Sequence, residues 1–285
     1  MSIKSVGVVG SGIMGSGIAE VAAKTGHEVI LRSRRQESAD AMVSSLEKSL
    51  AKQVERGRLS AEDRDSALGR VSATADLNDL AGCDLVLESI VEDLDTKKAL
   101  FKELDGICDE GTILASNTST LPVIELAMET NRPDKVCGVH FFNPAPAMAL
   151  VEIVKPLTAS DETIDSAKAF AAACGKTVVE VVDQAGFIVN NLLFPYLNNA
   201  VRLFENRVAT KEDIDEAMKG GCNFPMGPFA LLDLVGLDTS LAILDALYDE
   251  FKDTNFAARP LLKRMVAANQ LGRKSGKGFY DYARK

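Results

Sequence analysis

Long apolar runs, cysteine pairs and an excess of positive charge are all missing from this sequence. No stretch of its 285 residues approaches the roughly 20 apolar residues that a membrane-spanning helix needs. The N-terminal segment MSIKSVGVVG lacks the length and composition of a signal peptide. We therefore expect a cytoplasmic protein without a membrane partner.

The five cysteines are scattered, and none forms a CxxC or another metal-like pair. This pattern favours reduced thiols over disulfides and gives no sign of a metal site. The net charge of −9 argues against nucleic acid as the main partner, although local basic residues could still bind a small anion.

Apolar runs typical of buried strands alternate with helix-like segments over the first part of the chain. The expected strands are 4–9, 28–32, 83–90, 111–117, 135–142, 148–154 and 177–182, and the expected helices are 13–25, 36–58, 94–107, 121–130 and 160–173. This alternation predicts an α/β fold, a Rossmann-type doubly wound, mostly parallel sheet.

After Asp183 only helical patterns follow, over 186–206, 211–221, 229–251 and 259–272. We therefore predict a dinucleotide-binding Rossmann domain over 1–184 and an all-helical substrate and dimerisation domain over 185–285. The second domain holds more apolar residues than a small helical unit can hide, which favours a homodimer.

A glycine-rich turn follows the first expected strand. Gly10, Gly12 and Gly15, with Ile13 and Met14 between them, spell G-x-G-x-x-G at the start of a helix. In this context the motif predicts a site for the pyrophosphate of a dinucleotide, which would lie at the helix N-terminus. A tight turn that binds nothing is the alternative.

The acidic residue that normally grips the adenosine ribose after the second strand is absent. Ser33 stands in its place and is followed by Arg34 and Arg35. A hydroxyl flanked by guanidinium groups suits a 2′-phosphate, which a carboxylate would repel. We therefore expect NADP(H) as the preferred cofactor. The alternative is that the two arginines begin a solvated helix and NAD(H) still binds.

The sequence has only two histidines. His27 sits between a helix end and a strand and is expected to be an exposed loop residue. His140 ends an apolar strand at the carboxyl edge of the sheet, where ligands of open α/β folds bind. Glu152 lies within the next apolar strand, where an unpaired carboxylate is costly, so we expect the two to form a general acid/base pair. From composition alone, the alternative of a structural histidine and an edge-strand glutamate explains these two residues as well as an acid/base pair does.

Several longer motifs occur in a fixed order along almost the whole chain: GSGIMGSGIAEVAAKTGHEV, LASNTSTLP, HFFNPAPAMALVEIV, GFIVNNLL, PMGPFALLDLVGLD and GRKSGKGFYDY. With these motifs the chain resembles the 3-hydroxyacyl-CoA dehydrogenase family, particularly the monofunctional 3-hydroxybutyryl-CoA dehydrogenases. The resemblance implies a Rossmann domain followed by a helical dimerisation domain, with no fused hydratase domain.

The resemblance also implies roles for individual residues. His140 would be the acid/base that Glu152 orients, and Ser119 and Asn190 would bind the 3-oxygen of the substrate or position its thioester. The family position of Asn190 would place the chemistry where the two domains meet.

Two further residues match family positions near the cofactor. Glu92 and Lys97 would line the nicotinamide ribose, with a solvated helix start as the alternative. Asn117, which follows a strand, would also contact the cofactor. On the helix that follows the second strand, Lys52 would hold a phosphate of coenzyme A, although a solvated helix face explains it nearly as well.

We therefore expect an oxidoreductase that interconverts acetoacetyl-CoA and L-3-hydroxybutyryl-CoA by hydride transfer with a nicotinamide cofactor. A dehydrogenase of a free hydroxy acid or sugar acid is the alternative on the same scaffold. A non-catalytic dinucleotide-binding protein is the alternative of another class. Relatives usually have LRD where this chain has LRS, so the departure bears on cofactor choice and leaves the chemistry unchanged.

Overall fold

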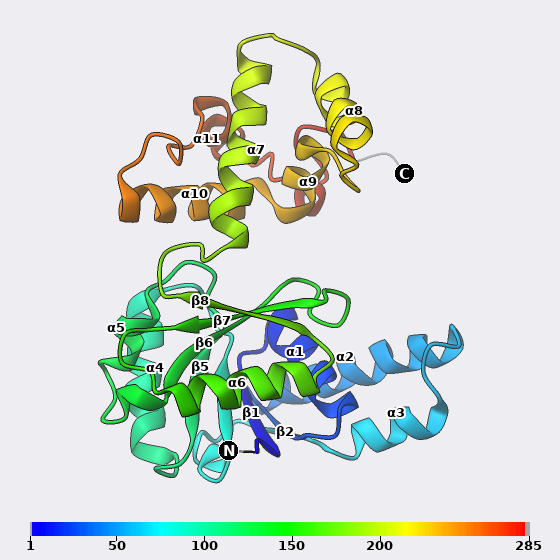
Figure 1. Ribbon diagram of the computed structural model, residues 1–285. Coiled ribbons are helices and arrows are strands. Elements are labelled where there is room, and N and C mark those ends of the chain that lie inside the picture. Colours follow the sequence, from blue (N-terminus) through cyan, green and yellow to red (C-terminus); the bar gives the residue numbers. More distant parts are fainter. Residues whose placement is uncertain (1, 283–285) are drawn as a thin grey trace. The chain divides into compact units, whose positions relative to one another are not determined.

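The computed structural model describes residues 2–282, and the chain divides into two compact units between Gln184 and Ala185. The first unit is an eight-stranded sheet with helices on both faces (Figure 1). Its strands are β1 Ser5–Val9, β2 Glu28–Arg32, β3 Val71–Thr74, β4 Leu85–Glu88, β5 Ile113–Ser116, β6 Val136–Phe141, β7 Leu150–Lys155 and β8 Thr177–Val182. Its α-helices are α1 Ile13–Lys24, α2 Gln36–Glu55, α3 Ala61–Leu68, α4 Leu94–Ile107, α5 Val123–Ala127 and α6 Asp161–Ala173.

The strand order is β3-β2-β1-β4-β5-β6-β7-β8. All neighbouring strands pair in parallel except β6 and β7, which are antiparallel. The chain reverses its direction of travel across the sheet between β1 and β4, and ligands of open α/β sheets bind at such a switch point. The predicted doubly wound, mostly parallel sheet is thereby confirmed.

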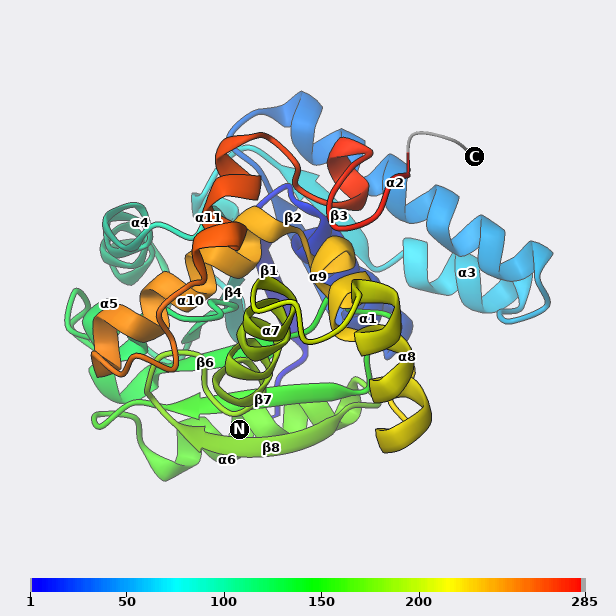
Figure 2. The same ribbon diagram turned by 90° about the horizontal axis from the view of Figure 1, so that it is seen from above.

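Helices α1, α2, α3 and α6 contribute to one apolar core against the sheet. On α2 the buried residues Ala39, Met42, Leu46 and Leu50 recur at helical spacing, which gives the helix one apolar stripe. Helices α2 and α3 lie side by side and extend away from the β2–β3 end of the sheet (Figures 1 and 2). Helices α4 and α5 pack together on the other face.

Several expected boundaries were wrong. The segment 61–74 had no predicted element, but it forms α3 and the short strand β3. The helix expected over 36–58 ends at Glu55, because the chain turns at Gly57 with φ of +65°. The strands expected over 83–90, 111–117 and 135–142 are shorter at both ends, and their ordered parts are β4, β5 and β6.

The second unit is all-helical, as predicted. It contains α7 Val189–Glu205, α8 Lys211–Cys222, α9 Pro228–Val235, α10 Leu237–Phe251 and α11 Pro260–Ala267. The single helix expected over 229–251 is two helices, because Gly236 adopts φ of +102° and breaks the chain direction. Helix α7 packs against α9, α10 and α11 around a shared apolar core.

Within residues 2–282, no helix combines the length and apolarity that crossing a membrane requires. The same residues contain no group of three or more His, Cys, Asp or Glu side chains arranged to hold a metal ion.

Candidate active site

The glycine turn joins β1 to α1 in a conformation that requires glycine at two positions. Gly10 has φ of +131°, and a Cβ there would lie 2.2 Å from the carbonyl oxygen of Ser89. A Cβ at Gly15 would lie 2.2 Å from the carbonyl oxygen of Gly10. Larger side chains would push the turn away from β4, so these positions fix the close packing of the turn.

The N-terminus of α1 suits an anion. Gly12 is its N-cap, and no side chain caps the first N–H groups. A Cβ at Gly12 would meet no atom within 4 Å, so the backbone stands open to a ligand. Of the intervening residues, Ile13 is 77% exposed and Met14 packs against the core. These features fit a dinucleotide pyrophosphate.

A cavity of about 490 Å³ runs beside this turn along the carboxyl ends of β2, β1 and β4. Its lining includes Arg32, Ser33, Arg34 and the segment 89–91. Ser33 is buried and its N–H donates to the carbonyl oxygen of Thr74, which fixes the end of β2 against β3. The structure therefore brings Ser33 and Arg34 to the same cavity as the glycine turn.

His140 and Glu152 face each other across the antiparallel β6–β7 pair. The imidazole Nδ1 lies 2.8 Å from Glu152 Oε2, and both side chains are buried, with Glu152 0% exposed. The predicted contact is therefore present, and Glu152 is not on an edge strand because β8 pairs beyond β7. With Nδ1–H donated to the carboxylate, Nε2 carries the lone pair and accepts from Ser119 Oγ at 3.2 Å.

The loop after β5 is anchored beside this pair. Asn117 Oδ1 accepts a hydrogen bond of 2.8 Å from the N–H of Phe141, the last residue of β6. The carboxylate of Glu92 accepts from Thr118 Oγ1 at 2.6 Å and from the N–H of Ser119 at 2.8 Å. These bonds hold Ser119 where its hydroxyl meets the imidazole.

Glu92 and Lys97 belong to a cluster that is largely buried. The ammonium of Lys97, which is 1% exposed, lies 3.1 Å from Glu92 Oε2 and 2.7 Å from Glu88 Oε1. Lys97 is therefore not a solvated residue at a helix start. Burial would raise the pKa of Glu92, but the Lys97 charge and the donors of the Ser119 loop hold it below its usual range.

Glu88 was not predicted as a functional residue. It is the last residue of β4, is 0% exposed, and accepts from the N–H of Ile90 at 2.6 Å and from Ser116 Oγ at 2.6 Å. The signal that identified Glu152, a carboxylate within an apolar strand, was also present in the run LVLES.

The remaining residues named from the sequence belong to other elements. Asn190 belongs to the second unit, where it is buried in the first turn of α7. Lys52 is exposed on α2. The expectation for His27 was wrong, because its ring is 6% exposed, bonds to the end of α1 and packs edge-on against Phe170 of α6.

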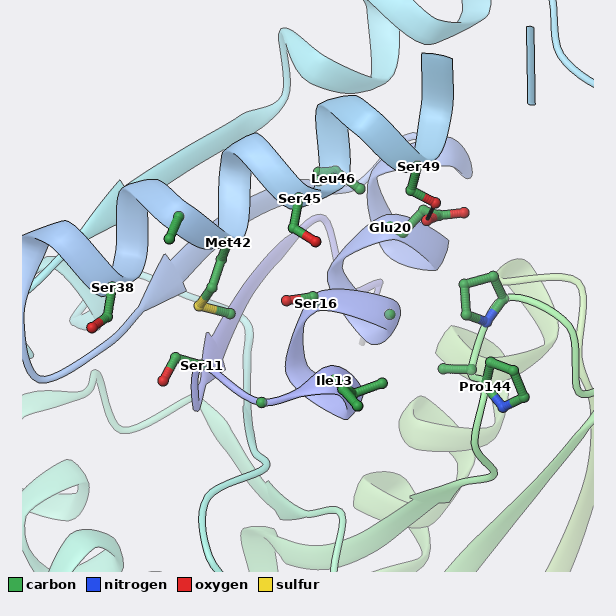
Figure 3. A pocket seen from close by; sticks show the side chains of 15 residues that line it. Ser11, Ile13, Ser16, Glu20, Ser38, Met42, Ser45, Leu46, Ser49 and Pro144 are labelled. Atoms are coloured by element: carbon green, nitrogen blue, oxygen red, sulfur yellow. Dashed lines mark hydrogen bonds between the residues drawn. The ribbon is translucent and has the colours of Figure 1, made fainter. Parts of the chain in front are cut away.

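A second cavity, of about 500 Å³, lies between α1, α2 and the loop 144–146 that follows β6 (Figure 3). Five serine side chains line it: Ser11, Ser16, Ser38, Ser45 and Ser49. The buried carboxylate of Glu20 also lines it and accepts from Ser49 Oγ at 2.7 Å. The cavity thus offers hydroxyl donors and an acceptor beside apolar proline rings.

Both parts of the chain match models of known protein families. Residues 5–184 match the model for the 3-hydroxyacyl-CoA dehydrogenase, NAD binding domain, and residues 186–282 match the model for the C-terminal domain of the same enzymes.

Two curated relatives are both described as 3-hydroxybutyryl-CoA dehydrogenase. That of Clostridioides difficile is 50% identical over 275 residues, covering 96% of this chain and 98% of the relative. That of Mycobacterium tuberculosis is 46% identical, covering 99% of each.

The crystal structure of (S)-3-hydroxybutyryl-CoA dehydrogenase from Ralstonia eutropha superimposes with a TM-score of 0.96 at 41% identity, over 99% of this chain and 100% of that one. The chain belongs to the 3-hydroxyacyl-CoA dehydrogenase family.

Proposed function

We propose that this protein interconverts acetoacetyl-CoA and L-3-hydroxybutyryl-CoA, with NADP(H) as its preferred cofactor. The observation that carries the proposal is the buried His140–Glu152 pair on β6 and β7, with Ser119 Oγ 3.2 Å from Nε2 of the imidazole. The names of the relatives above support the substrate class.

In this proposal His140 moves a proton between Nε2 and the 3-oxygen of the substrate. Nδ1 is committed to Glu152, so only Nε2 can exchange a proton with a ligand. When the hydroxyacyl substrate is oxidised, Nε2 accepts the hydroxyl proton, and the carboxylate of Glu152 stabilises the imidazolium that forms. The bound nicotinamide supplies or accepts the hydride at carbon 3.

Ser119 and Asn190 have positioning roles in the proposal. The Ser119 hydroxyl lies 3.2 Å from Nε2, so when substrate is bound it can turn its single proton from Nε2 to the 3-oxygen and hold that oxygen at the imidazole. We assign Asn190 to the same task from the family motif GFIVN. In the cofactor site, Asn117 holds the end of β6. From their family positions we assign the paired Glu92 and Lys97 to the nicotinamide ribose.

The cofactor preference rests on charge. A carboxylate at the end of β2 would accept hydrogen bonds from an unmodified ribose and repel a 2′-phosphate. Here Ser33 and Arg34 line that part of the cavity together with Arg32. Guanidinium groups bind phosphate oxygens in bidentate fashion, so this lining supports NADP(H).

The serine-lined cavity supports a coenzyme A thioester over a free acid. Its wall at 144–146 follows β6, the strand that carries His140, and we propose that a ligand with its acyl end at the imidazole extends into this cavity. Hydroxyl groups and the Glu20 carboxylate suit the amides and hydroxyl of a pantetheine arm. Lys52, one helical turn beyond Ser49, is assigned to a phosphate of the same ligand.

We further propose a homodimer that works in the cytoplasm. Large apolar side chains of the second unit are exposed: Leu192 71%, Leu203 38%, Leu234 49% and Phe251 38%. Such exposure supports a protein partner, and light scattering on the purified protein would show a dimer or a monomer. The cysteines are free thiols, which supports a reducing compartment.

The reaction is tested by following oxidation of the reduced cofactor with acetoacetyl-CoA or acetoacetate as substrate. We expect turnover of the thioester, weak or no turnover of the free acid, and loss of turnover in His140→Ala with cofactor binding retained. Turnover of acetoacetate at a similar kcat/KM would instead support the free-acid dehydrogenase. Near-normal activity of His140→Ala would refute its assignment.

A further inference from the structure

The cluster Glu88–Lys97–Glu92 carries more negative than positive charge. Glu88 accepts from three donors, namely the N–H of Ile90 at 2.6 Å, Lys97 Nζ at 2.7 Å and Ser116 Oγ at 2.6 Å. The Ser116 hydroxyl itself accepts from the N–H of Thr118, so its proton points to Glu88. A carboxyl group that only accepts is ionised.

Glu92 is ionised for the same reason. It accepts from Thr118 Oγ1, from the N–H of Ser119 and from Lys97 Nζ, and its pKa lies below the usual range for reasons given above. One ammonium therefore faces two carboxylates, and one negative charge is left over. Lys97 and Glu88 are 1% and 0% exposed and the Glu92 side chain is 40% exposed, so solvent screens this charge only in part.

The topology places this charge beside the nicotinamide end of a bound dinucleotide. A pyrophosphate would lie at the glycine turn between β1 and α1, and the adenosine would lie over β2 at Ser33. The other half of the molecule would then extend over β4 and β5 towards β6, which carries His140. Glu88 ends β4, and Glu92 binds the loop that follows β5.

The nicotinamide ring is a cation when oxidised and is neutral when reduced. We propose that the uncompensated negative charge of the Glu88–Lys97–Glu92 cluster stabilises the oxidised ring and lowers the reduction potential of the bound cofactor. This inference rests on the proposed function. It goes further because it gives Glu88, a residue with no role in the proton transfer, an electrostatic role in the hydride step.

The expected effect is modest. One unit charge about 8 Å from the ring, at an effective dielectric constant of about 40, changes the affinity of the charged form about fivefold. A fivefold change in the ratio of the two dissociation constants corresponds to about 20 mV in the potential of the bound two-electron couple.

The test measures dissociation constants for the oxidised and reduced cofactor, by calorimetry and by fluorescence of the reduced form, in the full chain. We compare wild type with Glu92→Gln and Glu88→Gln, each of which removes the extra charge. Glu125→Gln is the matched control, because Glu125 also pairs with a lysine, Lys98, but on the exposed surface. The ratio Kd(oxidised)/Kd(reduced) should rise about fivefold in the two cluster variants and stay constant in the control.

If the ratio Kd(oxidised)/Kd(reduced) rises less than about threefold in Glu92→Gln, the proposal is wrong. A merely structural role of Glu92 would weaken the binding of both cofactor forms equally and leave the ratio unchanged, which would also overturn the proposal. Because the Glu92 side chain is 40% exposed, Glu92→Gln should fold. It therefore tests the proposal even if Glu88→Gln fails to fold. Failure of the proposed function is distinguishable, since it appears as loss of acetoacetyl-CoA turnover in wild type, whereas the two dissociation constants are measured without substrate.

Discussion

Replacing Glu152 by glutamine isolates the contribution of one buried charge to the reaction. Glutamine has nearly the same shape, and its Oε1 can still accept the hydrogen bond from His140 Nδ1, so the imidazole keeps its orientation. The variant loses only the negative charge that sits 2.8 Å from the ring in a side chain that is 0% exposed.

The magnitude follows from this geometry. For charge centres about 4 Å apart at an effective dielectric constant of about 20, the attraction between imidazolium and carboxylate is about 4 kcal/mol. Loss of that stabilisation when the proton is transferred should lower kcat about 10³-fold. Cofactor affinity should be unchanged, because Glu152 lies in β7, away from the cavity beside the glycine turn.

The assay is steady-state oxidation of L-3-hydroxybutyryl-CoA by wild type and Glu152→Gln, with cofactor binding followed by fluorescence. If kcat of the variant stays within about threefold of wild type, less than about 0.7 kcal/mol of stabilisation is lost. The carboxylate would then not assist the proton transfer, and the mechanism above would be wrong.

Three further predictions concern the cofactor site and stability. Ser33→Asp should lower kcat/KM for NADPH about 100-fold by like-charge repulsion, and an unchanged value for NADPH would contradict the assigned phosphate site. Gly15→Ala should raise the Kd of the reduced cofactor about tenfold, because its Cβ would collide with the carbonyl oxygen of Gly10; fluorescence titration checks this, and unchanged affinity would show that the turn tolerates the methyl group. Asp105→Asn should lower the free energy of unfolding at pH 7 by about 2 kcal/mol, since Arg132 Nε donates to this buried carboxylate at 2.7 Å. Burial would raise the pKa of Asp105, but donors from Asn131 and Arg132 hold it below its usual range, so the wild-type advantage should persist above about pH 4 and shrink as the pH falls through the lowered pKa. Urea unfolding of both proteins at several pH values measures this difference in unfolding free energy. A difference that does not change with pH would show that ionisation of Asp105 does not stabilise the fold.

The His140–Glu152 contact could be predicted because both residues carry strong local signals. A histidine that ends an apolar strand and a carboxylate within the next strand each need a partner. Their meeting then follows from the antiparallel register of two neighbouring strands, β6 and β7. The glycine turn could also be predicted from the sequence, since its motif needs only a strand before it and a helix after it.

Other contacts depend on residues far apart in the sequence. Glu88 gave the same signal as Glu152, but one partner, Ser116, lies on β5, and nothing local indicated which residue would balance the charge. His27 is buried by Phe170 of α6, which no local pattern connects to it. Strand β3 was missed because VSAT is too short to give a clear strand pattern. Its extended conformation is stabilised by pairing with β2, which its own residues do not predict.

We propose that the cavity lined by Ser33 and Arg34 selects NADPH for the reduction of acetoacetyl-CoA at His140. This selection is measured most directly as kcat/KM of the wild-type protein for NADPH and for NADH with saturating acetoacetyl-CoA. We expect a value at least about tenfold higher for NADPH. A higher kcat/KM for NADH would show that Ser33 and Arg34 do not select NADPH.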